Sequence, residues 1–274
     1  MAGLPELKEV LAAMHARENG LVVAFSGGVD STLLARVARE TLPAGRLLAV
    51  TAQSPVRPRF ETEWAVQTAA ALDLPHILIE TDELSLPEFV ANSPERCYHC
   101  KKGLYRRLLA LAAERGLGLV ADGTNVDETR AYRPGLRAAA ECGIRSPLAQ
   151  AGLDKKSIRA LSRALGLANW DRPAYSCLAT RFPYGRRLTP EGLRRVEEGE
   201  GFLHSLGLRQ VRLRDHGEIA RLEVDPVELE RAFAARSSIV PALKGAGYLY
   251  VALDLEGYQS GSMDRVLPDQ RDAR

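Results

Sequence analysis

One short glycine-rich segment constrains this 274-residue chain more than any other feature. The residues Ser26-Gly27-Gly28-Val29-Asp30-Ser31 follow the apolar run 21–25 and precede segment 32–38, which has the spacing of an amphipathic helix. This pattern predicts a buried strand, a tight turn and a helix. The glycine N–H groups and the helix N-terminus favour an anion at the turn, and the two serines add hydroxyl donors.

The other residues of this loop narrow the kind of ligand. The loop has no lysine, so it is not the G-x-x-x-x-G-K-[ST] loop of kinases and ATPases. Asp30 is acidic, and its expected role is to hold a cation such as Mg²⁺ that accompanies the phosphates. The alternative is that Asp30 serves only as a helix N-cap.

Strand and helix patterns alternate over the first two thirds of the chain. Apolar runs at 47–51, 76–80 and 117–121 predict further strands, and periodic segments predict helices over 5–19, 60–73, 99–115, 133–142 and 155–165. Such alternation predicts an α/β fold, a Rossmann-like doubly wound parallel sheet, which we assign to residues 1–187. Ligands of these sheets bind at the carboxyl ends of the strands, where Ser26 and Asp122 both fall.

The pattern changes after residue 187. Thr189 and Pro190 predict the start of a helix that runs to about residue 206. Alternating strands over 210–214 and 218–224 predict a hairpin, followed by a helix over 225–234 and a strand over 248–255. We expect a smaller C-terminal α+β domain over 188–265 and a disordered polar tail over 266–274.

Composition limits the partners and the compartment. The chain is 46% hydrophobic, enough for a substantial core. Its net charge of +2 argues neither for nor against nucleic acid, but it is too small to imply a strongly basic RNA-binding surface, and we do not expect a nucleic-acid partner. No apolar run approaches the roughly 20 residues of a membrane span, and residues 1–10 lack a signal-peptide pattern. We therefore expect a cytoplasmic enzyme with a small-molecule nucleotide substrate and no membrane partner.

Two further groups of polar residues are candidates for phosphate or ribose contacts. Asp122-Gly123-Thr124-Asn125 directly follows a predicted strand, where the glycine permits close backbone approach. Taken alone, this segment is more typical of a simple Asp-Gly turn, but its place after the glycine-rich loop in an alternating sheet favours the nucleotide contact. Arg212 and Arg214 share one face of a predicted strand and could bind a second phosphate. The alternative is a solvated edge strand.

Four cysteines suggest sulfur or metal chemistry rather than disulfides. Cys97 and Cys100 form a C-x-x-C at a helix start, a spacing shared by redox pairs, zinc half-sites and cluster half-sites. With Cys177 they supply three thiolates, which suit a [4Fe–4S] cluster with one open position. The alternative is that the three are unrelated buried thiols. Cys142 lies in an Ala-rich helix and is more simply a small buried residue. Arg181 can neutralise a phosphate or a leaving AMP, or it can form a surface salt bridge.

Several segments together resemble one family. The loop at 26–31 resembles the PP-loop of ATP pyrophosphatases. In this loop and in five further segments the chain is similar to the LarE group of ATP-dependent sulfur transferases. The five segments are R-C-Y-H-C-K at 96–101, D-G-T-N at 122–125, Y-R-P-G at 132–135, R-S-P-L at 145–148 and P-A-Y-S-C-L-A-T-R-F-P-Y-G at 173–185. The resemblance covers roughly residues 20–260. It implies a PP-loop, adenine nucleotide alpha hydrolase-like domain over 1–187.

The resemblance also implies a reaction. ATP adenylates the carboxylates of a pyridinium biscarboxylate mononucleotide, and sulfur then displaces AMP to give thiocarboxylates for the nickel-pincer nucleotide cofactor. In some members the cysteine matching Cys177 gives up its own sulfur; others have three cysteines and a [4Fe–4S] cluster, and this chain resembles those. The resemblance further implies phosphate contacts from Arg212 and Arg214, a metal contact from Glu200, and a homo-oligomer.

Two other functions remain open at this point. Some PP-loop enzymes thiolate tRNA, but this chain has no additional C-x-x-C zinc module and only a modest net charge. A non-catalytic nucleotide-binding module would share the alternating sheet, but it would not need the cysteines. The sulfur source, either Cys177 itself or a cluster-bound sulfide, is also open.

Overall fold

A computed structural model describes residues 3–129, 134–259 and 261–267. The chain forms two compact units. Unit 1 comprises Met1–Glu83 and Glu95–Tyr175, and unit 2 comprises Leu84–Pro94 and Ser176–Arg274. Tyr132 and Arg133 of the Y-R-P-G motif and residues 268–274 of the expected tail lie outside the described residues.

Unit 1 is built on a parallel sheet of four strands. The strand order is β3-β2-β1-β4, with all neighbours parallel, and the strands are β1 (Leu21–Ala24), β2 (Leu47–Gln53), β3 (His76–Glu80) and β4 (Leu119–Ala121). Since parallel neighbours need crossover connections, helices separate the strands along the chain. This confirms the α/β parallel-sheet prediction.

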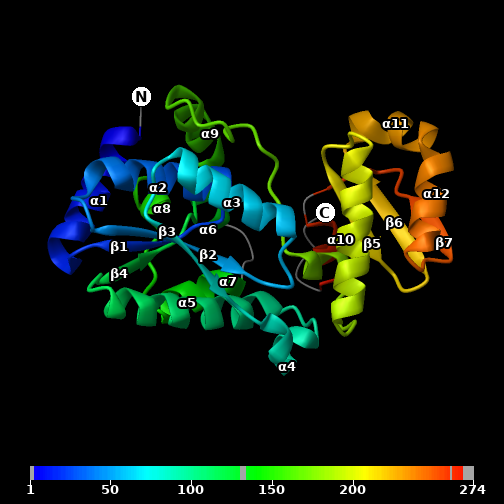
Figure 1. The fold of residues 1–274 in the computed structure, drawn as a ribbon, viewed down its shortest axis with the longest axis horizontal. Coiled ribbons are helices and arrows are strands. Elements are labelled where there is room, and N and C mark those ends of the chain that lie inside the picture. The colour runs from blue at the N-terminus through cyan, green and yellow to red at the C-terminus, as the bar shows by residue number, and fades with distance from the viewer. Residues whose placement is uncertain (1–2, 130–133, 260, 268–274) are drawn as a thin grey trace. The chain divides into compact units, whose positions relative to one another are not determined.

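Apolar side chains alternate between the two faces of this sheet. Leu21 and Val23 of β1 join one hydrophobic core, whereas Val22 joins the other. The first core contains residues of α1, α2 and α3, and the second contains residues of α5 and α7, so helices cover both faces (Figure 1). The helices of unit 1 are α1 (Leu4–Glu18), α2 (Val29–Thr41), α3 (Arg59–Ala71), α5 (Arg96–Glu114), α6 (Val126–Thr129), α7 (Pro134–Glu141), α8 (Pro147–Gln150) and α9 (Lys155–Ala164). The 3₁₀ turn η1 (Glu83–Ser85) begins in unit 1 and continues into unit 2.

Unit 2 contains a sheet of three strands in the order β5-β6-β7. The strands β5 (Val211–Asp215) and β6 (Ile219–Val224) form the expected antiparallel hairpin, and β7 (Tyr250–Leu253) pairs parallel to β6. The helix α10 (Pro190–Ser205) begins as expected, because the Thr189 side chain accepts a hydrogen bond from Gly192 N at 3.1 Å. The remaining elements are α4 (Pro87–Val90), η2 (Leu178–Arg181), η3 (Pro226–Glu228), α11 (Leu229–Ala234), α12 (Arg236–Gly245) and η4 (Ser262–Val266).

Helix α12 contains Pro241 and is not among the helices that the sequence predicts. A proline inside a helical pattern normally marks a break, because it lacks an N–H group and its ring crowds the preceding turn. Here Ile239 and Leu243 are buried on one face, so packing maintains the helix across the proline. Together α11 and α12 form the crossover that a parallel β6–β7 pair requires.

The two units divide at a different place from the predicted boundary at residue 187. Unit 2 begins at Ser176 and also takes in Leu84–Pro94. Backbone hydrogen bonds explain this assignment: Leu188 N donates to Val90 O at 2.9 Å, and Gly185 N donates to Asn92 O at 3.0 Å. The side chain of Asn92 also donates to Pro183 O at 2.9 Å. Such pairing between distant segments leaves no periodic signal in the sequence.

No helix in the part of the chain that the structure describes combines the length and the apolar character needed to cross a bilayer.

Candidate functional site

The glycine-rich loop between β1 and α2 is held by its two serines. Ser26 Oγ accepts a hydrogen bond from Gly28 N at 3.2 Å and lies 3.0 Å from Ser31 Oγ. Ser31 Oγ in turn donates to Gly28 O and accepts from Ser26 N, both at 3.2 Å. The loop is therefore already folded at the carboxyl end of β1, with α2 starting at Val29.

Gly27 makes the tightest approach in this loop. Its φ of 71° lies in the left-handed region, and a Cβ there would lie 2.8 Å from Ala65 Cα of α3. Its carbonyl accepts hydrogen bonds from Trp64 Nε1 at 3.1 Å and from Asn169 Nδ2 at 3.0 Å. The glycine therefore allows the loop to pack directly against α3.

We expect Gly27→Ala to lower both stability and affinity for ATP. The left-handed conformation alone costs an alanine about 1–2 kcal/mol, and the overlap with the Ala65 backbone adds to that cost. Gly45→Ala is the matched control, since its φ is 76° and no described atom lies within 4 Å of its added Cβ. Urea denaturation and ATP titration check the pair; equal losses in both variants would show that close packing at Gly27 contributes nothing.

The segment Asp122–Asn125 packs against the glycine-rich loop at the carboxyl end of β4. A Cβ on Gly123 would lie 3.0 Å from Ser31 N and 3.3 Å from Asp30 Cβ, so the two backbones nearly touch. Asn125 Nδ2 donates to Asp30 Oδ1 at 3.3 Å. The structure therefore brings together all the residues predicted for the nucleotide site in unit 1: Ser26, Gly27, Gly28, Asp30, Ser31, Asp122, Gly123, Thr124 and Asn125.

Asp122 is buried, and both of its carboxylate oxygens accept hydrogen bonds within the protein. It accepts from Tyr105 OH at 2.7 Å, from Ser146 Oγ at 2.9 Å and from Thr124 N at 3.1 Å. These bonds fix the conformation of the segment. A direct contact from Asp122 to ribose or phosphate stays a prediction.

Lys101 adds a cation beside this cluster. Burial alone would lower its pKa, but the interaction with Tyr105 and the charge of Asp122 outweigh burial and raise the pKa above its usual value. The ammonium also lies 5.2 Å from the centre of the Tyr105 ring. Lys101 therefore stays protonated near neutral pH and balances the carboxylate of Asp122.

The C-x-x-C motif lies in the first turn of α5, as its sequence position indicated. Cys97 and Cys100 are both half-buried. Cys100 Sγ donates to Glu83 Oε1 at 3.9 Å, and that carboxylate also accepts from Thr81 Oγ1 at 3.0 Å and from Ser54 Oγ. Glu83 is buried and was not singled out from the sequence, because nothing in the pattern around it marks a site.

A second missed residue lies at the glycine-rich loop itself. Lys155 Nζ forms an ion pair with Asp30 Oδ2. Lys155 is the first residue of α9, where Asp154 serves as N-cap by accepting from Ser157 N at 2.7 Å. The sequence around Lys155 indicates only an ordinary helix start, so it does not predict an ion pair with a residue 125 positions earlier.

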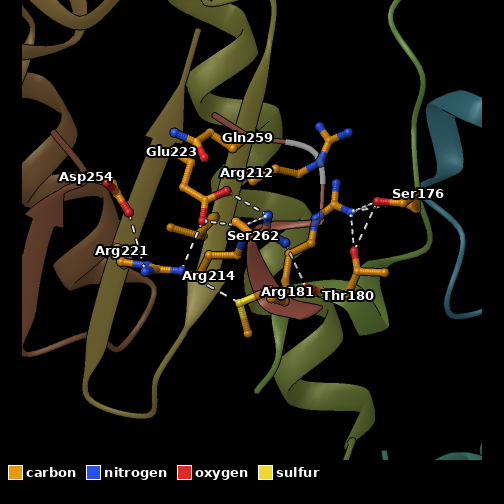
Figure 2. Close-up of polar contacts among 12 residues, drawn as sticks. Ser176, Thr180, Arg181, Arg212, Arg214, Arg221, Glu223, Asp254, Gln259 and Ser262 are labelled. Atoms are coloured by element: carbon orange, nitrogen blue, oxygen red, sulfur yellow. Dashed lines mark hydrogen bonds and ion pairs between the residues drawn. The ribbon is translucent and has the colours of Figure 1, made fainter. Parts of the chain in front are cut away.

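In unit 2, Arg181 holds the segment that carries Cys177. Arg181 Nη1 donates to Ser176 O at 3.0 Å, to Cys177 O at 3.2 Å and to Thr180 Oγ1 at 2.9 Å. Arg181 Nε and Nη2 donate to Oε1 and Oε2 of Glu200, both at 2.8 Å. Figure 2 shows Arg181 directed at Ser176 and Thr180. The side chain is fully buried, so it positions the Cys177 segment.

Arg212 and Arg214 lie in the same region of unit 2 (Figure 2). Both side chains are buried, so the alternative of a solvated edge strand is wrong. Arg214 donates to Glu223 Oε2 at 2.6 Å, to Ser262 Oγ at 2.9 Å and to Thr180 O at 2.8 Å. Burial and the like charge of Arg181 lower the pKa of Arg212. Gathering several guanidiniums in this way favours an anionic ligand.

The three thiols proposed as cluster ligands are divided between the units. Cys97 and Cys100 belong to unit 1 and Cys177 belongs to unit 2, where it is half-buried. Within the residues that the structure describes, no group of three or more histidine, cysteine or acidic side chains is placed to hold a metal ion. The cluster therefore stays a prediction.

A known relative matches nearly the whole chain, both units included. Pyridinium-3,5-bisthiocarboxylic acid mononucleotide synthase of Lactiplantibacillus plantarum is 37% identical over 267 residues, which cover 97% of each protein. The chain belongs to the LarE-type family of ATP-dependent sulfur transferases. It is thus an adenylating enzyme that uses ATP and Mg²⁺. The carboxylate of Asp30, one of the hard oxygen donors that Mg²⁺ prefers, fits that cation.

Other matches agree with this family assignment. The family model described as asparagine synthase matches residues 8–109, which include the glycine-rich loop and the C-x-x-C. An uncharacterised protein of Synechocystis is 44% identical over 90% of this chain and 92% of its own length. An uncharacterised protein of Methanocaldococcus jannaschii is 30% identical over 88% of this chain and 91% of its own length.

Proposed function

We propose that this LarE-type enzyme converts the carboxylates of a pyridinium-3,5-biscarboxylic acid mononucleotide into thiocarboxylates. The observation that carries the proposal is the 37% identity, over 97% of both chains, to the synthase whose name specifies the bisthiocarboxylic acid product. The preformed glycine-rich loop and the anchored Cys177 segment support it, because they supply a nucleotide site and a sulfur nucleophile.

The chemistry proceeds in two displacements. A substrate carboxylate oxygen attacks the α-phosphorus of ATP, an acyl–phosphate bond forms, and pyrophosphate leaves. A sulfur nucleophile then attacks the acyl carbon, a carbon–sulfur bond forms, and AMP leaves with the bonding electron pair. An inorganic sulfide gives the thiocarboxylate directly. The Cys177 thiolate would give a thioester, which releases thiocarboxylate only when the Cα proton is removed and the Cβ–Sγ bond breaks, with the electron pair leaving on sulfur and dehydroalanine left in the chain. The first step is needed because a carboxylate is a poor acyl donor. The protein must also exclude water, which would hydrolyse the adenylate.

The residues of unit 1 serve the first displacement. The loop that contains Ser26, Gly28 and Ser31 offers backbone and hydroxyl donors to the departing pyrophosphate, and Asp30 holds Mg²⁺. The carboxylate of Asp122 fixes the neighbouring segment, in which Gly123 leaves room for the nucleotide backbone. In unit 2, Arg181 orients the Cys177 segment for the second displacement, and Arg212 and Arg214 receive the phosphate of the mononucleotide.

The donor set also fits a [4Fe–4S] cluster. Cys97 and Cys100 occupy one helical turn of α5, which suits two thiolate ligands, and Cys177 would be the third ligand. When bound, such a cluster has an open iron position that can hold an added sulfide. We propose that the protein is of this three-cysteine kind, and that it works in cytoplasm as a homo-oligomer.

The state of Cys177 after turnover separates the two possible sulfur sources. For a three-cysteine enzyme reconstituted anaerobically with iron and sulfide, we expect mass spectrometry to find Cys177 as an intact thiol after several turnovers. A loss of one H₂S from Cys177, matched to each sulfur in the product, would show that the protein gives up its own sulfur. Cys142 is the internal control, since it is expected to stay unchanged in both cases.

A second measurement tests the reaction class itself. Pyrophosphate release that depends on the pyridinium biscarboxylate mononucleotide is expected, together with product that is heavier by the exchange of oxygen for sulfur. Release that depends on tRNA instead would assign the enzyme to RNA thiolation. The absence of release with either substrate, in protein that binds ATP, would favour a non-catalytic module.

A further inference from the structure

The glycine-rich loop has no positively charged residue of its own, and a lysine from another helix contacts it. The loop 26–31 contains one acidic residue and no basic residue, yet its ligand is a polyphosphate. P-loop nucleotidases meet this need with a lysine inside the motif. In the part of the chain that the structure describes, Lys155 of α9 forms an ion pair with this loop.

Lys155 is fixed at its backbone, whereas its side chain is partly exposed to solvent. Its N–H donates to Asp127 Oδ2 at 2.9 Å, and Asp154 caps the same helical turn. Ile158 and Leu161 of α9 are buried in the core shared with α2. The side chain itself remains 34% exposed, and that of Asp30 21% exposed, so the ion pair faces solvent at the loop. This geometry leaves the ammonium able to change partners without moving the helix.

The two oxygens of Asp30 are both engaged in this arrangement. Asn125 Nδ2 donates to Oδ1 at 3.3 Å, and the ammonium of Lys155 occupies Oδ2. A lysine ammonium and a divalent cation repel each other when both contact the same carboxylate oxygen, because both carry positive charge. Binding of a metal at Asp30 therefore favours departure of Lys155 from Oδ2, and the displaced ammonium is then stabilised by a new anion.

We infer that Lys155 is a nucleotide-binding residue that exchanges partners. Without nucleotide it neutralises Asp30, and with Mg²⁺-ATP it transfers its contact to the β or γ phosphate while Asp30 binds the metal. The inference deepens the proposed function and rests on its adenylating step. The exchange keeps every charge paired in both states. It also couples release of pyrophosphate to restoration of the Lys155–Asp30 pair.

Binding measurements on variants of the full-length protein test this exchange without relying on sulfur transfer. Lys155→Met removes the charge and keeps the side-chain length, Lys155→Arg keeps the charge, and Lys156→Ala alters an exposed neighbour in the same turn. With a non-hydrolysable ATP analogue and Mg²⁺, we expect Lys155→Met to weaken binding roughly 10- to 100-fold, the usual value of a charge-assisted contact. Lys155→Arg should lose at most a few-fold, and Lys156→Ala should match the unmodified protein.

Two further readouts separate partner exchange from a purely structural ion pair. AMP lacks the β and γ phosphates, so its affinity should be the same in Lys155→Met and in the unmodified protein. Mn²⁺ titrated without nucleotide should bind more tightly to Lys155→Met, because the competing ammonium has gone. Equal weakening for AMP and the triphosphate, or unchanged triphosphate binding, would overturn the inference and show that Lys155 only pins the loop.

A double-mutant cycle in metal-free buffer gives the sharpest test. Asp30→Asn releases Lys155, so metal-free ATP analogue should bind more tightly to this variant than to the unmodified protein. The double variant Asp30→Asn, Lys155→Met should bind the metal-free analogue no more tightly than Lys155→Met alone. A gain of the same size in both backgrounds would show that only repulsion from Asp30 was relieved, which contradicts the exchange. If the unmodified protein binds no triphosphate at all, the proposed function itself fails, a result distinct from all of these.

Discussion

Replacing Cys177 by alanine is expected to abolish sulfur transfer while leaving the adenylating half of the reaction intact. The Cys177 thiol is either the sulfur donor or one of three cluster ligands, so both proposed routes lose their sulfur without it. The nucleotide site is built from unit 1 residues such as Ser26 and Gly28, and Cys177 belongs to unit 2. Product thiocarboxylate should fall below detection by mass spectrometry, whereas substrate-dependent exchange of labelled pyrophosphate into ATP should persist within a few-fold.

Cys142→Ala is the matched control for this experiment. Cys142 is also half-buried, but it packs at the edge of the hydrophobic core formed by α5, α7 and the sheet. Its removal should leave sulfur transfer unchanged and cost only a small amount of stability. Full product formation by Cys177→Ala would refute the assigned role of the thiol, and loss of pyrophosphate exchange in that variant would show that Cys177 is needed before sulfur enters.

The sheet of unit 1 could be predicted because each strand is a short apolar run separated from the next by a periodic helix. Strand β3 was predicted at its observed bounds, His76–Glu80. The division into units could not be predicted, because the pairing of Leu84–Pro94 with residues 182–188 depends on backbone hydrogen bonds such as Leu188 N to Val90 O. Those bonds do not depend on residue type, so they leave no mark in composition or spacing.

The candidate site likewise contains residues that the sequence predicted and residues that it did not. The loops that carry Asp30 and Asp122 were expected to meet, because the carboxyl ends of neighbouring parallel strands share one edge, and the structure brings them into contact at Gly123. Lys155 and Glu83 were missed, since each reaches its partner through tertiary packing of separate elements. Arg181 was expected to face a phosphate; its contacts with Glu200 and the Cys177 carbonyl favour a positioning role instead.

Substituting glutamine for Glu200 is expected to destabilise unit 2 by about 3–5 kcal/mol, the usual cost of leaving a buried charge without its partner. Glu200 and Arg181 are both buried, and the pair is joined by two hydrogen bonds of 2.8 Å. Glu200 also accepts from Leu213 N at 2.9 Å, so the carboxylate links α10 to β5. Urea denaturation measures the loss. The control is Glu256→Gln, which breaks an exposed pair with Arg265 and should cost less than 1 kcal/mol.

The pH dependence of stability provides an independent check on the same pair. Burial by itself would raise the pKa of Glu200, but the charge and hydrogen bonds of Arg181 outweigh burial and lower the pKa below its usual value. A carboxylate with a lowered folded-state pKa stabilises the fold fully above its unfolded pKa, about 4.3, and loses that contribution as pH falls through the lower folded value. Unmodified protein should therefore lose stability in this acid range more steeply than Glu200→Gln, which has no proton to bind. Parallel acid profiles for the two proteins would mean that the Arg181–Glu200 pair does not stabilise unit 2, and the positioning of Cys177 by Arg181 would lose its energetic basis.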